Sequence, residues 1–177
     1  MIKASLILLL SIIFFDCQAK VEEQSLNDDP PQDMPQEMPS DFDFSLQFGI
    51  QKKNEINTFE GKLTKDLIAD GTVTGDLILT EEEMKDIYER MLEIKIVETK
   101  DFTPEHINGE VCTQEPHEED EWNIVINDEI LTHSISGSFC EPTNDAKQFF
   151  ELRDEVFNKI KKKDEYKSLP ESQGGYE

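Results

Sequence analysis

The strongest constraint on the fold is an apolar side chain at every second position of the segment DFDFSLQFGI, residues 41–50. Successive side chains of a β-strand point to opposite faces, so this alternation predicts a strand with one buried and one solvated face. We interpret the stripe as one wall of a hydrophobic core rather than a groove for an apolar ligand, because such stripes are normally buried. The apolar residues of the stripe are Phe42, Phe44, Leu46, Phe48 and Ile50.

Apolar and polar residues also alternate in four later segments, which predicts four further strands. The polar residues 51–57 are expected to form the turn between the first and second strands. Asn127 and Asp128 are expected to form a tight turn between the last two. The four additional strands are predicted at residues 58–67, 72–79, 122–126 and 130–136.

Two other segments, at about residues 80–95 and 144–162, repeat apolar residues three or four positions apart, as the buried face of an amphipathic helix does. The first segment begins with a capping box formed by Thr80 and Glu83. Two amphipathic helices need an apolar surface to cover. The sequence therefore predicts an α+β fold in the order βββαββα, with an antiparallel sheet of about five strands and two helices packed on one face.

The 177 residues carry a formal net charge of -23, from 40 acidic and 17 basic residues. Such a charge repels phosphate backbones and anionic lipid surfaces, so we expect no nucleic-acid partner and no direct membrane binding. Cationic proteins and divalent cations would be attracted to it. The alternative is that the charge serves only to keep the protein soluble.

The first 19 residues have the features of an export signal. Lys3 supplies a positive charge, and the apolar run at residues 4–15 is shorter than the roughly 20 residues that span a bilayer. Cys17-Gln18-Ala19 matches a small-x-Ala cleavage site, which would leave Lys20 at the mature N-terminus. Alternatively, Cys17 is a candidate for lipidation, as in bacterial lipoproteins. Both alternatives predict a secreted or cell-envelope protein, and a lipid anchor, if Cys17 carries one, would be its only contact with the membrane.

The rest of the chain divides by composition. Residues 20–40 are acidic and proline-rich and have few large hydrophobic side chains, which predicts a disordered tether. Residues 41–166 contain all the periodic segments and are predicted to form one α+β domain. Residues 167–177 have little periodicity and are predicted to be a C-terminal tail.

Cysteine usage fits an oxidising compartment. Once Cys17 is removed with the signal or lipidated, Cys112 and Cys140 remain as a pair. Two remaining cysteines in an exported protein usually bridge each other, so we expect a disulfide between them. It would join the two outer ends of the hairpin predicted at residues 122–136.

Three phrases of the sequence resemble a group of small exported proteins and lipoproteins of bacteria, many of them spore-forming. The phrases are NEINTFEGKLTKDLI (54–68), LTEEEMKDIYERMLEI (79–94) and DEYKSLP (164–170). The likeness extends over most of residues 42–170 and is one of layout, without a catalytic signature. It implies a bacterial, extracytoplasmic protein with a single domain. We know of no established activity for that group, so the resemblance assigns no functional residues.

The acidic segment EPHEEDE, residues 115–121, is the richest cluster of candidate metal ligands. Calcium prefers carboxylate oxygens, so weak calcium binding by Glu115, Glu118, Glu119 and Asp120 is one hypothesis. A solvated surface loop is the alternative. No zinc site is indicated, because the three histidines lack paired spacing and no HExxH motif occurs.

His133 is the one candidate for nucleophilic or general-base catalysis, because serines and Cys140 follow it in HSISGSFC. The sequence contains no GxSxG elbow, and Cys140 has a disulfide partner available, so a half-buried structural histidine is the alternative. No catalytic residues or cofactor are therefore assigned.

The sequence as a whole predicts a non-enzymatic binding domain, secreted or anchored to the cell envelope, whose partner is an unknown protein or cationic ligand. Its working surface is expected to be the polar face of the sheet together with the acidic residues 113–121. Three alternatives stay open. They are an exported hydrolase-type enzyme that uses His133, a calcium-dependent adhesion or sensing module, and an inhibitor of a cationic enzyme.

Overall fold

The computed structural model of the chain describes residues 33–105 and 111–176. The expected export signal at residues 1–19, Cys17 and residues 20–32 of the expected tether lie outside the described residues. None of the described helices combines the length and the apolar character that crossing a bilayer requires.

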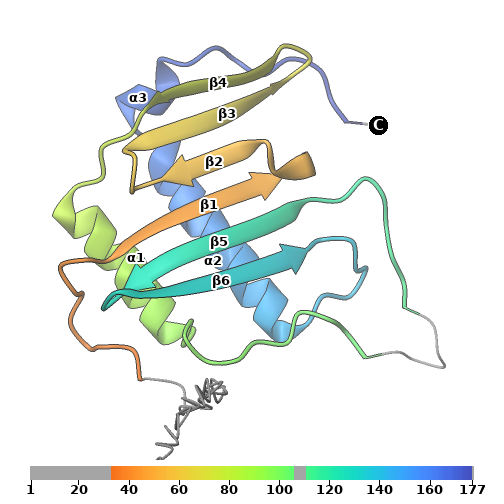
Figure 1. Cartoon of the computed structure of the whole chain (residues 1–177). Coiled ribbons are helices and arrows are strands. Elements are labelled where there is room, and N and C mark those ends of the chain that lie inside the picture. Colours follow the sequence, from red (N-terminus) through yellow and green to blue (C-terminus); the bar gives the residue numbers. More distant parts are fainter. Residues whose placement is uncertain (1–32, 106–110, 177) are drawn as a thin grey trace, which may run out of the picture. The chain divides into compact units, whose positions relative to one another are not determined.

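The architecture is α+β: one antiparallel sheet of six strands, with the helices behind it in the view of Figure 1. The strands lie in the order β4-β3-β2-β1-β5-β6, so the first strand of the chain is central and β4 and β6 form the edges. The strands are β1 (Asp43–Gly49), β2 (Asn54–Asn57), β3 (Lys62–Ile68), β4 (Gly71–Asp76), β5 (Glu119–Ile126) and β6 (Glu129–Ser136). The helices are α1 (Glu81–Glu93), α2 (Asn144–Ile160), the short α3 (Asp164–Lys167) and the 3-10 turn η1 (Ile50–Lys52).

The predicted count of five strands was one too low, because residues 54–57 form a strand and not part of a turn. The chain reverses earlier, at η1, where Gly49, Gln51 and Lys52 all have positive φ angles. This tight reversal leaves Ile56 opposite Leu46 of β1. One apolar residue in four is too short an alternation to be recognised as a strand without its neighbours.

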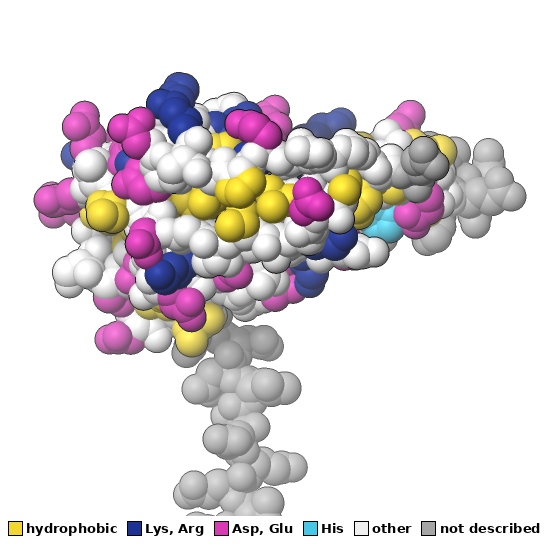
Figure 2. Space-filling model, turned by 90° about the horizontal axis from the view of Figure 1, so that it is seen from above, with side chains coloured by type: hydrophobic (Ala, Val, Ile, Leu, Met, Phe, Trp, Pro, Cys, Tyr) yellow, Lys and Arg dark blue, Asp and Glu magenta, His cyan; other side chains and the backbone are white. Residues whose placement is uncertain are grey.

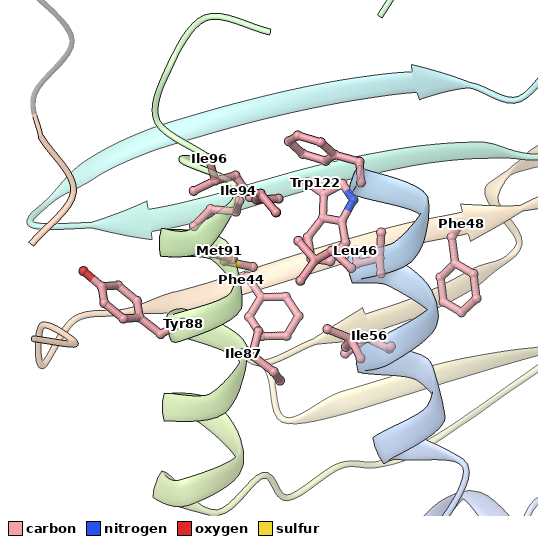
Figure 3. Close-up of a cluster of buried hydrophobic side chains, with 14 of the residues drawn as sticks. Phe44, Leu46, Phe48, Ile56, Ile87, Tyr88, Met91, Ile94, Ile96 and Trp122 are labelled. Atoms are coloured by element: carbon pink, nitrogen blue, oxygen red, sulfur yellow. The ribbon is translucent and has the colours of Figure 1, made fainter. Parts of the chain in front are cut away.

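The stripe is a wall of the core from Phe42 to Phe48, as predicted, whereas Ile50 lies in η1 and is not part of the buried cluster. Phe44 and Leu46 are fully buried, and Phe42 and Phe48 retain only 5% and 6% exposure. Figure 3 shows Phe44 and Leu46 facing α1 and α2, beside Ile87 and Met91 of α1. The ring of Phe48 packs edge-on against Phe157 of α2, with centroids 4.9 Å apart. The alternation therefore places one face of the sheet against the helices and leaves the other to solvent.

Each long helix is started by a threonine cap and held to the other by ion pairs. Thr80 and Glu83 form the predicted capping box at α1, and Thr143 Oγ1 accepts a hydrogen bond from the Ala146 amide at α2. Three contacts join α1 to the antiparallel α2 and to Lys163, which lies just beyond the end of α2, each one turn further along. They are Lys163 to Glu83 at 2.8 Å, Lys159 to Asp86 at 2.7 Å and Arg90 to Glu155 at 3.2 Å.

The described chain is packed beyond both ends of the expected domain at 41–166. On the N-terminal side Met34 is buried in the core, and Tyr88 Oη donates a hydrogen bond of 2.7 Å to the Pro35 carbonyl. On the C-terminal side Gln173 exchanges backbone hydrogen bonds with Leu67 and Ala69 at the end of β3. These contacts fasten both flanking segments to the sheet and its helices.

The disulfide between Cys112 and Cys140 is present, with Cα atoms 5.4 Å apart. The disulfide lies beyond the paired ends of β5 and β6, where backbone hydrogen bonds continue between the segment before β5 and the segment after β6. The amide of Cys140 donates to the Cys112 carbonyl at 3.1 Å, and the amide of Gly137 donates to the Glu118 carbonyl at 2.8 Å. The bond thus fixes the open end of the hairpin, and the Asn127–Asp128 turn closes the other end with positive φ at both residues.

Replacing both cysteines, Cys112→Ala with Cys140→Ala, is expected to lower the free energy of unfolding by about 3–4 kcal/mol, because the bond closes a loop of 28 residues in the unfolded chain. Urea unfolding followed by the fluorescence of Trp122 measures the change. Treating the wild-type protein with a thiol reductant should reproduce it, and the same reductant should leave the double variant unaffected. Equal unfolding midpoints for the wild type and the variant would contradict the expectation.

Candidate functional site

The candidate site is the face of the sheet opposite the helices, which we call the open face. Figure 1 looks onto it, with α1 and α2 behind. The strand register assigns its residues, because directly paired residues share a face. In strands β1, β2, β5 and β6 these residues are Asp43, Ser45, Gln47, Glu55, Asn57, Glu119, Glu121, Asn123, Val125, Ile130, Thr132, Ser134 and Ser136.

Small polar side chains on the open face hold one another across the strands. Thr132 Oγ1 donates to Asn123 Oδ1 at 2.9 Å, and Thr64 and Thr74 share a hydrogen bond of 3.0 Å. Lys52 Nζ lies 2.6 Å from Glu121 Oε2. The surface is therefore ordered before any partner arrives, which lowers the entropy cost of binding.

Charge is distributed unevenly over this surface. From Asp101 to Ala146 the chain contains twelve acidic residues and no Lys or Arg. This stretch includes β5, β6 and the disulfide, whereas β3 and the β1–β2 turn carry lysines. The β5–β6 side of the open face is thus the negative side, where a cationic partner would be attracted.

The acidic segment that the sequence analysis singled out is divided by strand geometry. β5 begins at Glu119, so the loop expected to reach residue 121 ends earlier. Glu119 and Glu121 point to the open face, opposite Gly49 and Gln47 of β1, while Asp120 points to the helices. Across residues 33–105 and 111–176, no three His, Cys, Asp or Glu side chains converge as metal ligands would. The proposed calcium ligands, Glu115, Glu118, Glu119 and Asp120, are therefore not brought together into such a group.

Asp120 forms a buried ion pair that the sequence analysis missed. It is fully buried, and its Oδ1 lies 3.1 Å from Nη1 of Arg153 on α2. The same guanidinium contacts Glu118 Oε2 at 2.8 Å and Asp154 Oδ1 at 3.1 Å. Two local patterns point to this pair. Asp120 continues the inward parity of Trp122, and Arg153 follows the buried Leu152 on the sheet-facing side of its helix.

Burial raises the pKa of the Asp120 carboxyl to about 7, and this outweighs the attraction of Arg153, which lowers the pKa. The carboxylates of Glu118 and Asp154 raise the pKa further by repulsion. Asp120 Oδ2 is buried and has no hydrogen-bonding partner in the described part of the chain. In the ionised carboxylate only Oδ1 is therefore hydrogen-bonded, which disfavours the charged form. This group titrates near neutral pH but lies beneath the sheet, away from the open face.

His133 belongs to the packed side of β6. Its Nε2 lies 2.9 Å from the Ile96 carbonyl oxygen, and because a carbonyl only accepts, Nε2 carries the proton of that hydrogen bond. Its ring packs edge-on against Phe149 and Phe102, with centroids 4.9 Å and 5.9 Å away. Burial lowers its pKa. Since Cys140 is in the disulfide, these contacts support the structural interpretation of the histidine more than a catalytic one.

No protein-family model matches the chain, and neither a curated protein nor a solved structure matches it significantly. The chemistry of the described residues therefore carries the functional argument.

The substitution Asp120→Asn is expected to change how stability depends on pH. The folded-state pKa of about 7 exceeds the unfolded value of about 3.9, so between these values the folded protein holds a proton that the unfolded chain releases. This contribution to stability is complete below about pH 4 and is lost as the pH rises to about 7. In urea unfolding across this range, the unfolding free energy of the variant should rise relative to that of the wild type by up to about 1.4 kcal/mol for each pH unit of increase.

Glu118→Gln is the matched control, because it removes a solvated carboxylate, 53% exposed, from the same guanidinium. Its stability profile should stay parallel to that of the wild type. Parallel profiles for Asp120→Asn as well would show that Asp120 has no raised pKa.

Arg153→Met is expected to destabilise the protein by roughly 3–5 kcal/mol at about pH 8, since it leaves a buried carboxylate without its cation. At about pH 5 the loss should be smaller, because Asp120 is then protonated. Adding Asp120→Asn to Arg153→Met should restore part of the stability at the higher pH. An Arg153→Met cost that does not vary with pH would contradict this coupling.

Proposed function

We propose that this protein is a non-catalytic binding domain, exported and either secreted or held at the cell envelope, which captures a cationic protein. The observation that carries the proposal is the open face. No described helix or loop crosses its centre, most of its side chains are polar, and its β5–β6 side lies in a stretch without Lys or Arg.

The export part of the proposal is supported by two features. The first 19 residues have the composition of a signal peptide. The Cys112–Cys140 pair is a disulfide whose cysteines are both exposed, and exposed disulfides persist in oxidising compartments. Whether Cys17 is removed or lipidated decides between a secreted and an anchored protein.

Binding by charge also follows from the arrangement of the ion pairs. On the helix side, Lys159 of α2 pairs with Asp86 of α1, Arg90 of α1 pairs with Glu155 of α2, and Lys163, just beyond the end of α2, pairs with Glu83. On the open face, among the described residues, only Lys52 and Lys62 form such pairs, with Glu121 and Asp76. Glu119, Asp128 and Glu129 pair with no described lysine or arginine, so their charge stays available to a partner, which favours rapid, charge-steered association.

The proposal is tested with lysozyme as a folded cationic probe, using the chain from Pro31 onward. Binding measured by biolayer interferometry at about 50 mM salt should weaken by about tenfold or more at about 300 mM salt. Glu119→Gln with Glu121→Gln should weaken it at low salt. The control, Glu81→Gln with Glu82→Gln, removes the same charge from the first turn of α1 and should have little effect.

Two outcomes would overturn the proposal. The first is no binding to lysozyme or to other cationic hydrolases at low salt. The second is an equal loss of affinity in both pairs of variants, which would show attraction by net charge alone and not by the open face. The hydrolase alternative is checked on the same samples, because it requires a turnover that His133→Ala abolishes.

A further inference from the structure

We propose that the outer edge of β6 is a strand-addition site for an extended cationic segment of the partner. This rests on the proposed function and specifies its recognition mode: an added seventh strand, paired through backbone hydrogen bonds beside β6. The site is defined by Ile130, Thr132, Ser134 and Ser136.

The hydrogen-bond phase of the hairpin shows which backbone groups are available. Asn127 and Asp128 form a two-residue turn, so Ile126 and Glu129 are the hydrogen-bonded pair that closes it. In an antiparallel ladder such pairs alternate with non-bonded ones. Counted in this way from Ile126 and Glu129, Glu118 and Gly137 at the far end should again be a bonded pair, and the Gly137 amide does donate to the Glu118 carbonyl.

The amides and carbonyls of the four site residues therefore point away from β5, at alternate positions along the edge. Within residues 33–105 and 111–176, no backbone group hydrogen-bonds to them. The neighbouring segment contacts β6 on the helix side, where His133 bonds to Ile96. An incoming strand would find an eight-residue edge with donors and acceptors at regular spacing.

The sequence of β6 lacks the features that normally protect an edge strand. EILTHSIS contains no Pro, Lys or Arg and no bulge interrupts its pairing with β5, and Ile130 is 74% exposed. The opposite edge differs. β4 has six residues, two of them glycine, and Leu169 packs against Gly75. Figure 2 looks at the molecule from the β4 side and shows a band of hydrophobic side chains with charged side chains of both signs around it. The two edges are thus unequal, and β6 is the one suited to strand pairing.

Charge selects a cationic segment over a second copy of this chain. The hairpin of β5 and β6 carries five acidic residues and no Lys or Arg, so a second copy would bring its own acidic hairpin against it. Ser134 and Ser136 are short, and they pair with Glu121 and Glu119 of β5. A lysine or arginine on the added strand, about 4.8 Å from β6, can reach over these serines towards the carboxylates. At the other end, Ile130 and Val125 offer an apolar contact.

The test uses a capped peptide of alternating lysine and valine as the probe, with binding measured by titration of the chain from Pro31 onward. Thr132→Pro with Ser134→Pro removes two outward amide donors while leaving the β5 ladder intact, which edge strands tolerate. We expect it to weaken peptide binding by about tenfold or more, in line with two lost hydrogen bonds. Thr132→Ala with Ser134→Ala keeps both donors and should bind within about twofold of the wild type.

The ligand side provides a second measurement that does not depend on the variants folding. Methylating alternate backbone nitrogens of the peptide removes its donors without changing its charge, and this should abolish binding to the wild-type protein. Circular dichroism and the Trp122 signal report whether the proline variant is folded.

Three outcomes would overturn strand addition. One is binding that the proline variant and the methylated peptide leave unchanged; the proposed function would survive it, because lysozyme binding through the open face is measured separately. Another is a dimer, seen by analytical ultracentrifugation of the wild type and lost in the proline variant, which would assign the edge to a second copy. Absence of any peptide binding to the wild type also overturns it.

Discussion

Burial of one face of the sheet beneath α1 and α2 is the constraint on which the other features depend. The apolar stripe of β1 lies at the centre of the strand order and contacts both helices, so it is the surface around which the described elements pack. The described part of the chain has two long helices, and both lie on the same side of the sheet. The opposite face meets water, and this is why most of its residues are polar: threonine, serine, asparagine, glutamine and carboxylates.

The same constraint explains why a charge lies in the core. Asp120 has the inward parity of β5, and shifting the register to expose it would turn Trp122 and Ile124 out to solvent. The strand keeps its hydrophobic register, and Arg153 from α2 covers the carboxylate. The acidic start of β5 thus requires a cation from the helix above it, which ties the placement of α2 to the charge of the hairpin.

Charge and hydrogen bonding then separate the two sides of the molecule. Between the helices, lysines and arginines are neutralised in successive turns, so those ion pairs serve packing. Around β5 and β6, Glu118, Asp120 and Glu121 have a cationic partner, whereas Glu119, Asp128 and Glu129 pair with no described lysine or arginine, and an open strand edge lies beside them. Attraction at long range and backbone pairing at short range would therefore act at the same place, which is the arrangement that the binding proposals describe.

Much of the fold could be predicted from local patterns. The alternating residues of β1, β5 and β6, the capping box at Thr80 and the tight turn at Asn127 each depend on neighbours in the chain, and all are present. The pairing of Cys112 with Cys140 was also predicted, from the number of cysteines available. The short strand β2 escaped prediction because one inward residue, Ile56, gives too little signal without its partners.

The sequence by itself determined five of the six described strands and both long helices, and which face of each is apolar, because periodicity and capping act within a few residues. Only the tertiary structure decided the strand order, the division of residues 115–121 between two faces, the pairing of Asp120 with Arg153, and the unequal edges β4 and β6. Those features depend on contacts between residues far apart in the chain, whose partners no local pattern identifies.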